Sequence, residues 1–129
     1  MTVADTDVLI DYMAGRADDA SQVAAELERG TLHTTVITQF ELLAGARSPR
    51  QREIVLQLLE AIPAISLDVD GADRAAQVRR TLEARGEALG MGDCLIAGIV
   101  LQHGAILATR NRRHFERVPG LGIAGPHVS

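Results

Sequence analysis

Short apolar segments alternate with amphipathic segments along this chain, and that alternation restricts the possible folds more than any other feature. The apolar segments have the length of β-strands and lie at residues 2–5, 32–37, 64–67, 105–109 and 121–124. The segments between them show helical periodicity and lie at residues 8–15, 18–30, 38–46, 48–62, 70–86 and 91–104. Strands joined by helices of this length pair in parallel. We therefore expect an α/β fold, a three-layer sandwich in which helices cover both faces of a central parallel sheet of four to five strands.

Several element ends carry local signals. Ser48 followed by Pro49 indicates an N-cap and a first helical position. An aspartate cap is expected for the helix at residues 18–30. The segment at residues 105–109 has few polar residues, which predicts a strand inside the sheet, and residues 121–124 are expected at an edge.

The composition excludes several classes of protein. The 129 residues, 47% hydrophobic and 23% charged, suit a single domain that spans residues 1–129. The one cysteine, Cys94, excludes an intramolecular disulfide and a cysteine-ligated zinc site. Acids at positions 5, 7 and 11 argue against a signal peptide, and no apolar run approaches the ~20 residues of a membrane span. We therefore expect a cytoplasmic protein without membrane contact.

Acidic residues interrupt the apolar start of the chain at Asp5, Asp7 and Asp11. A charged group in an apolar setting is costly unless a metal ion or a helix cap compensates it. Asp5 is the strongest candidate for a site because it ends a strand. The i, i+4 spacing of Asp7 and Asp11 favours the solvent-facing side of a helix for Asp11.

More polar side chains stand near the ends of the other strands, at Glu41, Asp93, Asn111 and Glu116. Parallel strands bring their carboxyl ends to one edge of the sheet, where ligands bind in folds of this kind. Asp5, Glu41 and Asp93 are therefore expected to converge on one acidic pocket. Oxygen ligands of this type suit hard cations such as Mg²⁺ or Mn²⁺.

Each acid also has a purely structural interpretation. Glu41 stands three residues after Thr38, so that the pair fits a capping box. Asp93 follows Gly92 and fits a plain N-cap. The metal-site hypothesis therefore depends on the whole set of acids and not on any single member.

The basic residues are unevenly distributed. All 13 are arginine, and the absence of lysine excludes a Walker-type loop for nucleotide hydrolysis. The formal net charge of −4 gives no general sign of nucleic-acid binding. The segment RNRRHFER, residues 110–117, is nevertheless rich in arginine, which fits either a solvated turn or a phosphate-binding patch.

Three segments together resemble PIN-domain ribonucleases, specifically VapC-type toxins of type II toxin–antitoxin pairs. They are ADTDVLIDYMAG near the start, TTVITQFELLAGA in the middle and MGDCLIAGIVLQHGAILATRNRRHFERVPGLGI near the end. The last is the most specific, because an Asp opens an apolar helix that is followed by a strand, a Thr-x-Asn turn, a Phe and VPGL. The resemblance covers nearly the whole chain and implies a PIN-like sandwich with metal-dependent endoribonuclease activity.

The resemblance implies a metal site built on Asp5, Glu41 and Asp93, with Asn111 as a fourth catalytic residue. Family members carry Asp or Asn at this fourth place. The neutral carbonyl of Asn111 would hold a second cation weakly, and Glu116 is a nearby substitute. Relatives often carry Ser or Asn where this chain has a further acid, Asp7, whose role stays open.

The resulting hypothesis is cleavage of an RNA phosphodiester with Mg²⁺ or Mn²⁺ as cofactor. Asp5 and Asp93 would hold the ion, which activates water and neutralises charge in the transition state, while Glu41 completes the coordination or orients the water. The residues expected to contact RNA share the turn after the fourth strand: Thr109, Arg110, Arg112 and Arg113.

The resemblance also implies partners. It predicts a homodimer, a cognate antitoxin whose tail covers the active site, and transfer or ribosomal RNA as the substrate class. Two alternatives stay open, namely a catalytically weak PIN-like module that binds RNA or protein, and a small phosphatase. The helices at residues 48–62 and 70–86 carry apolar stripes that fit either a partner or their own sheet.

Overall fold

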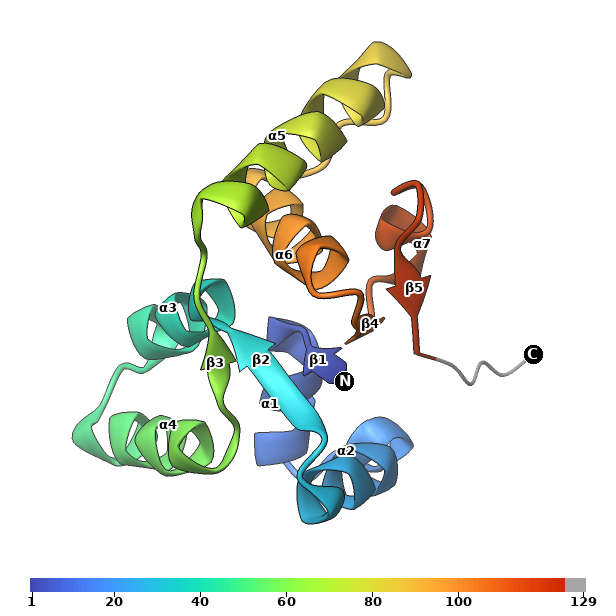
Figure 1. Cartoon of the computed structure of the whole chain (residues 1–129). Helices are drawn as coiled ribbons and strands as arrows, with labels where there is room; N and C mark the ends of the chain where they lie inside the picture. Colours follow the sequence, from blue (N-terminus) through green and yellow to red (C-terminus); the bar gives the residue numbers. More distant parts are fainter. Residues whose placement is uncertain (125–129) are drawn as a thin grey trace.

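A parallel β-sheet forms the centre of the molecule (Figure 1). The computed structural model describes residues 1–124, with the side chains of residues 17–22 excepted. The strand order is β3-β2-β1-β4-β5, and each neighbouring pair is parallel. The strands are β1 (Thr2–Ala4), β2 (Leu32–Thr35), β3 (Ala64–Ile65), β4 (Ile106–Ala108) and β5 (Gly122–Ile123). The expected α/β fold with helices on both faces is confirmed, with β4 inside the sheet and β5 at its edge.

The helices divide into two layers. One layer contains α1 (Thr6–Met13), α2 (Ala17–Arg29), α3 (Val36–Gly45) and α4 (Pro49–Ala61), and the other contains α5 (Val69–Ala84), α6 (Met91–Gln102) and α7 (Arg112–Phe115). Each layer has its own hydrophobic cluster against the sheet. Val3 belongs to the cluster of α5, α6 and α7, while Ala4 belongs to the other, because successive strand residues point to opposite faces.

Helices α5 and α6 pack closely against each other, as Figure 1 shows at the top of the molecule. The contact depends on Gly98, because a Cβ atom there would lie 2.5 Å from the carbonyl oxygen of Gly71 and 2.6 Å from the nitrogen of Ala75. The apolar stripe expected for residues 70–86 therefore packs against α6 of the same chain, and α6 lies between α5 and the sheet.

The helix starts confirm one expected cap and correct another. Ser48 caps α4 by accepting a hydrogen bond from the Gln51 N–H at 3.1 Å, and Pro49 is the first helical residue. The aspartate cap expected for α2 is wrong, since the N-cap position is Arg16, whose side chain makes no cap bond. Helix α2 still ends at Gly30, which has a φ of 72°.

Several boundaries differ from the sequence prediction by a few residues, and one helix is additional. The strand expected at residues 32–37 stops at Thr35, because its hydroxyl accepts a hydrogen bond from the Thr38 N–H and starts α3 there. The arginine-rich turn contains a short helix, α7, that the sequence did not predict. Its anchor is Phe115, which is fully buried. None of the helices in residues 1–124 is both long and apolar enough to cross a lipid bilayer.

Candidate functional site

A cleft of about 310 Å³ opens at the carboxyl edge of the sheet. It is lined by Asp5, Thr6, Asp7, Glu41, Asp93 and Asn111. The three acids that the sequence singled out therefore share one cleft, although they come from separate elements. Asp7 also lies in this cleft, which settles the position that the sequence left open.

Asp5 is the most enclosed acid of the cleft, with 5% of its surface exposed. It follows β1 directly and is the N-cap of α1, where its Oδ1 accepts a hydrogen bond from the Thr6 N–H at 2.7 Å. Its Oδ2 accepts a hydrogen bond from the Thr109 hydroxyl at 2.7 Å. Its own N–H donates to the Ala108 carbonyl at 2.9 Å, which ties it to the end of β4. Asp5 is thus both a helix cap and a cleft residue.

The electrostatics of Asp5 favour a bound cation. The pKa of Asp5 is raised to about 6, chiefly by burial and also by the nearby charges of Asp93 and Asp7, while the hydrogen bonds from Thr109 and Thr6 oppose the rise. A positive ion in the cleft would reverse this effect, because an opposite charge stabilises the ionised carboxylate.

Glu41 reaches the cleft from the middle of α3. Its Oε1 accepts a hydrogen bond from the Thr6 hydroxyl, so the first turn of α1 holds the carboxylate. A Cβ atom at Gly92 would lie 3.2 Å from Glu41 Oε2, and the absence of a side chain there lets α6 approach this acid. The capping-box interpretation is wrong, because the cap of α3 is Thr35 and Thr38 lies inside the helix.

Asp93 lies in the first turn of α6, where the helix dipole favours negative charge. The plain N-cap interpretation is wrong, because the N-cap position is Gly90. Burial raises the pKa of Asp93, and the charges of Glu41 and Asp7 raise it as well, while His114 lowers it. The acids therefore repel one another across the cleft.

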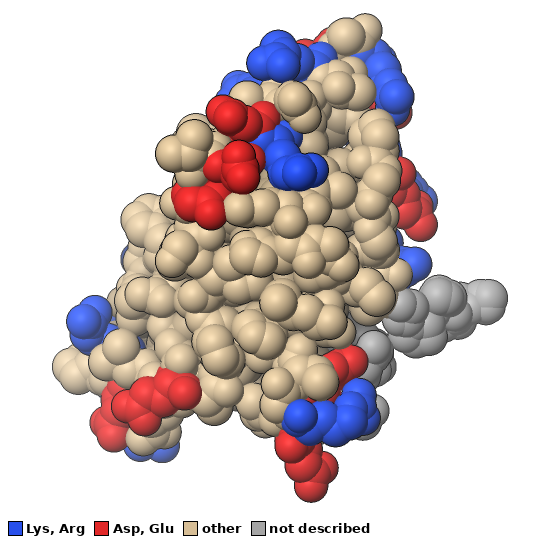
Figure 2. Space-filling model, viewed as in Figure 1, with Lys and Arg blue, Asp and Glu red and all other residues tan. Residues whose placement is uncertain are grey.

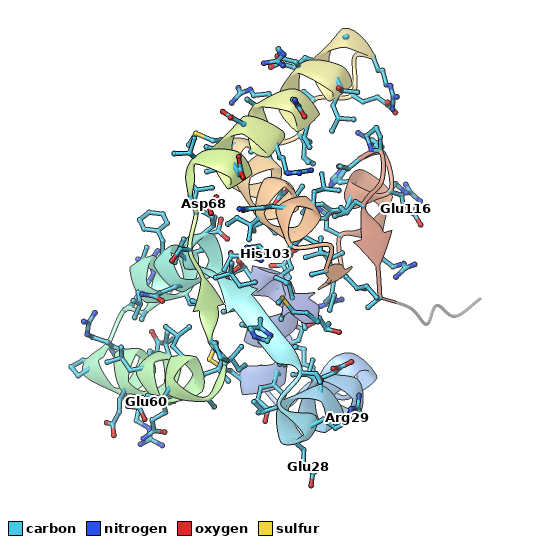
Figure 3. All side chains as sticks on the ribbon, in the orientation of Figure 1. Glu28, Arg29, Glu60, Asp68, His103 and Glu116 are labelled. Carbon is cyan, nitrogen blue, oxygen red and sulfur yellow. The ribbon has the colours of Figure 1, made fainter. Side chains whose placement is uncertain are left out.

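Asn111 completes the lining of the cleft from the turn after β4. Its N–H donates to the Thr109 hydroxyl oxygen at 2.9 Å, so Thr109 links the turn to Asp5. Thr109 itself is only 8% exposed. Glu116, the substitute that the sequence offered, is exposed beside α7 near the outer edge of the molecule (Figure 3) and does not line the cleft.

The arginines of residues 110–117 lie in different environments. Arg110 pairs with Asp11, and Arg112 donates to the carbonyl of Ala124 at 2.6 Å. Arg113 is exposed. The solvent-facing position expected for Asp11 is wrong, since the residue is 6% exposed and its two oxygens bind Arg110 and Arg16.

The donor set suits a hard divalent cation that keeps part of its water shell. Carboxylate and amide oxygens are the ligands such ions prefer, and Mg²⁺ is usually bound by one or two carboxylates together with waters. Among the side chains that the structure describes, no three His, Cys, Asp or Glu residues are arranged to hold one ion directly.

One residue of the cleft was missed by the sequence analysis. Thr6 donates its N–H to Asp5 and its hydroxyl to Glu41, and the same hydroxyl oxygen lies 3.0 Å from that of Thr38. The available signal was its place directly after an acid that ends a strand. Its N–H and its hydroxyl together connect two acids that are far apart in sequence, which only the packing of α1 on α3 makes possible.

Comparisons with known proteins agree with this architecture. A protein-family model described as PIN domain matches residues 2–121. The chain is 33% identical over 99 residues to the tRNA(fMet)-specific endonuclease VapC of Shigella flexneri, covering 74% of this chain and 75% of that protein. It is 30% identical over 117 residues to Ribonuclease VapC10 of Mycobacterium tuberculosis, covering 89% and 86%.

Solved structures show the same fold. VapBC2 from Rickettsia felis, bound to a DNA fragment from its promoter, superposes with a TM-score of 0.86 at 21% identity, covering 95% of this chain and 96% of that one. DNA-bound VapBC from Salmonella typhimurium superposes with a TM-score of 0.81 at 26% identity and the same coverage. Both are complexes by their descriptions, and the matched chain in each has nearly the length of the present one.

Proposed function

Because the chain belongs to the PIN-domain family, as a VapC-type endoribonuclease toxin of a toxin–antitoxin pair, we propose that the acidic cleft is its active site and requires Mg²⁺ or Mn²⁺. The observation that carries the proposal is the convergence of Asp5, Glu41 and Asp93 on one cleft from three separate elements. The raised pKa values of Asp5 and Asp93 support it, because they indicate acids that lack a compensating positive charge.

Each cleft residue has a proposed part. Asp5 and Asp93 would hold the divalent cation, and Glu41 would complete its outer coordination or orient the attacking water. Asn111 offers a neutral carbonyl oxygen to the same cleft. A bound divalent cation supplies Lewis-acid activation of water and neutralises charge on the phosphate.

The neighbouring hydroxyl groups position these acids. Thr109 donates to Asp5 Oδ2 and thereby directs the other lone pairs of that carboxylate toward the cleft. Thr6 does the same for Glu41. The arginines of the turn after β4 hold the phosphates on either side of the cleavage point, which gives affinity without base recognition.

The partners follow from the relatives. We propose transfer or ribosomal RNA as the substrate class, supported by a relative whose name specifies tRNA(fMet). The VapBC structures support an antitoxin as the protein partner.

We also propose a homodimer, supported by large apolar side chains that are exposed on three helices, Phe40 at 69%, Val69 at 77% and Met91 at 66%. Light scattering of the purified protein measures its mass in solution and thereby tests the homodimer.

The decisive experiment is RNA cleavage with Mg²⁺, with Mn²⁺ and with EDTA. We expect cleavage only with the cations, and a loss of about a hundred-fold or more in Asp5→Asn, in the range that removal of one group stabilising the transition state produces. Asp73→Asn is the matched control, because it removes an exposed acid of α5 outside the cleft. Cleavage that persists in EDTA, or equal activity of Asp5→Asn and Asp73→Asn, contradicts the proposal.

A further inference from the structure

Two arginines from different parts of the chain meet on one enclosed carboxylate. Asp11 on α1 accepts a hydrogen bond from Arg16 Nη1 at one oxygen and from Arg110 Nη1 at the other. The side chain of Asp11 is 8% exposed, whereas those of Arg16 and Arg110 are 62% and 52% exposed. The carboxylate is therefore shielded while both guanidinium groups face solvent.

This cluster lies next to the acidic cleft. Arg110 stands between Thr109, which bonds to Asp5, and Asn111, which lines the cleft. Asp11 follows Asp5 by six residues on the same helix, which corresponds to about 9 Å along its axis. Both arginines are therefore bound to the helix whose first turn lines the cleft.

The backbone fixes the position of Arg16. Its N–H donates to the carbonyl oxygen of Asp11 at 3.0 Å, so Asp11 holds this arginine through both its main chain and its side chain. Gly15 precedes it with a φ of 71°, a left-handed conformation that allows the chain to turn from α1 into α2. Neither guanidinium needs a large rearrangement to meet a ligand.

The charges of the cluster favour an anion. Two guanidinium groups against one carboxylate leave one net positive charge, beside a cleft that carries four acids. Among the side chains that the structure describes, each arginine bonds to Asp11 through Nη1, which leaves Nε and Nη2 to donate to an oxygen pair. Guanidinium groups bind phosphate in this bidentate manner.

We propose that Arg16 and Arg110, prepositioned by Asp11, form a phosphate subsite for the RNA strand that enters the acidic cleft. The proposal rests on the proposed ribonuclease function and adds to it a residue from the α1–α2 turn, Arg16, far from the arginine-rich segment. Asp11 is a positioning residue, because it acts on the RNA only through the two arginines.

The test measures RNA binding separately from cleavage. All variants carry Asp5→Asn to prevent cleavage, and a short fluorescein-labelled single-stranded RNA is titrated in Mg²⁺ buffer over a series of salt concentrations. We expect Arg16→Gln and Arg110→Gln each to weaken binding about five-fold and to reduce the slope of log K against log salt by about 0.7, the value for one phosphate contact on a single strand.

A matched control has the same change of charge elsewhere. Arg80→Gln removes an exposed arginine of α5, whose outer end carries the blue side chains at the top of Figure 2. We expect its salt slope to equal that of the parent. Equal slopes for Arg16→Gln, Arg110→Gln and Arg80→Gln would overturn the subsite.

Asp11→Asn separates positioning from charge. This change makes the cluster more positive but releases both guanidinium groups, so we expect weaker RNA binding. Tighter binding would show that charge alone attracts the RNA and would overturn the positioning role. RNA cleavage by the protein that retains Asp5 is measured in parallel. This measurement distinguishes a failure of the nuclease proposal from a failure of the subsite.

Discussion

Asp5 combines two roles that the sequence presented as alternatives. Its Oδ1 caps α1, while its Oδ2 and its position place it in the cleft among other acids. A buried carboxylate with two hydrogen bonds still has a raised pKa here, because burial and neighbouring acids outweigh those bonds. The residue therefore stabilises the helix start and, when ionised, weakens the fold unless a cation is present.

That balance predicts how stability depends on pH. The pKa of Asp5 is about 6 in the folded protein, compared with an ordinary value of 3.8. Between pH 3.8 and pH 6 the native state therefore holds more protons than the unfolded chain. The free energy of unfolding of the metal-free protein should then fall by about 2 kcal/mol as pH rises from 4 to 6.5, since one pKa unit corresponds to about 1.4 kcal/mol. Urea denaturation in buffer with EDTA measures this fall in the free energy of unfolding.

Asp5→Asn is the control for this prediction. The amide does not titrate, so the fall in stability should become much smaller. The raised pKa of Asp93 still lowers stability over that range, while the lowered pKa of Glu26, whose ordinary value is 4.5, raises it at the acidic end. The carboxylates of Asp11 and Asp68 have lowered pKa values and change stability at more acidic pH. An unchanged slope in Asp5→Asn would contradict the assignment to Asp5.

At the scale of elements, α1 connects the site to the rest of the molecule. Its first turn holds Asp5, Thr6 and Asp7 at the cleft, and one turn and a half later it presents Asp11 to the arginines. Its apolar residues Val8 and Leu9 are buried in the cluster beneath the sheet. One short helix thus places the acidic cleft and the basic cluster side by side.

The contact between α5 and α6 gives a prediction about packing. Gly98→Ala should destabilise the protein by about 2 kcal/mol, because its Cβ would meet backbone atoms of α5 and force the two helices apart. Since Asp93 lies on α6, this displacement also moves one acid of the cleft. Thermal and urea unfolding measure the loss.

Gly45→Ala is the matched control, because nothing lies within 4 Å of a Cβ atom at that position in α3. Alanine has the higher helix propensity, so the change should be neutral or slightly stabilising. A loss for Gly45→Ala as large as that for Gly98→Ala would show that the contact of α5 with α6 is not the cause.

At the scale of the whole molecule, the parallel topology creates the site. Every strand of the sheet runs in the same direction, so the segments after β1, β2 and β4 all emerge at one edge. Asp5, Glu41 and Asn111 lie in or just after these segments, and α6 brings Asp93 to the same place. The site needs the complete sheet, because no single segment holds more than part of it.

This arrangement predicts that divalent cations stabilise the fold. A ligand that binds only the native state at one hundred times its Kd adds about 2.7 kcal/mol to the free energy of unfolding. We therefore expect Mg²⁺ to raise the Tm near pH 7.5, and much less near pH 5, where protons compete for Asp5. Scanning calorimetry with and without Mg²⁺ measures the shift.

Asp93→Asn should reduce this stabilisation, whereas Asp73→Asn on the exposed surface of α5 should retain it. A Tm that responds to Mg²⁺ equally in both variants would place the bound ion outside the cleft. The measurement requires no RNA, so it tests the metal site independently of cleavage.

Local pattern predicted most of the fold and part of the site. Helical and strand periodicity located each strand and all helices except α7, whose single turn is too short to show a period. The prediction that Ser48 caps a helix is confirmed, because a cap forms hydrogen bonds only to residues a few positions along the chain. The interpretations of Glu41 as part of a cap and of Asp11 as a surface residue failed, since their partners Thr6 and Arg110 come from other elements. Asp93 is not a cap because the N-cap position of α6 is Gly90.

The sequence alone determined the order of the longer elements and the parallel sheet, because periodicity and chain connectivity are local properties, and the resemblance of three segments indicated the family. Only the tertiary structure decided which acids face one another, which hydroxyl groups hold them and which arginines share Asp11. The physical reason is that hydrogen bonds, burial and charge act over a few ångströms in space, between residues as far apart in the chain as Asp5 and Thr109.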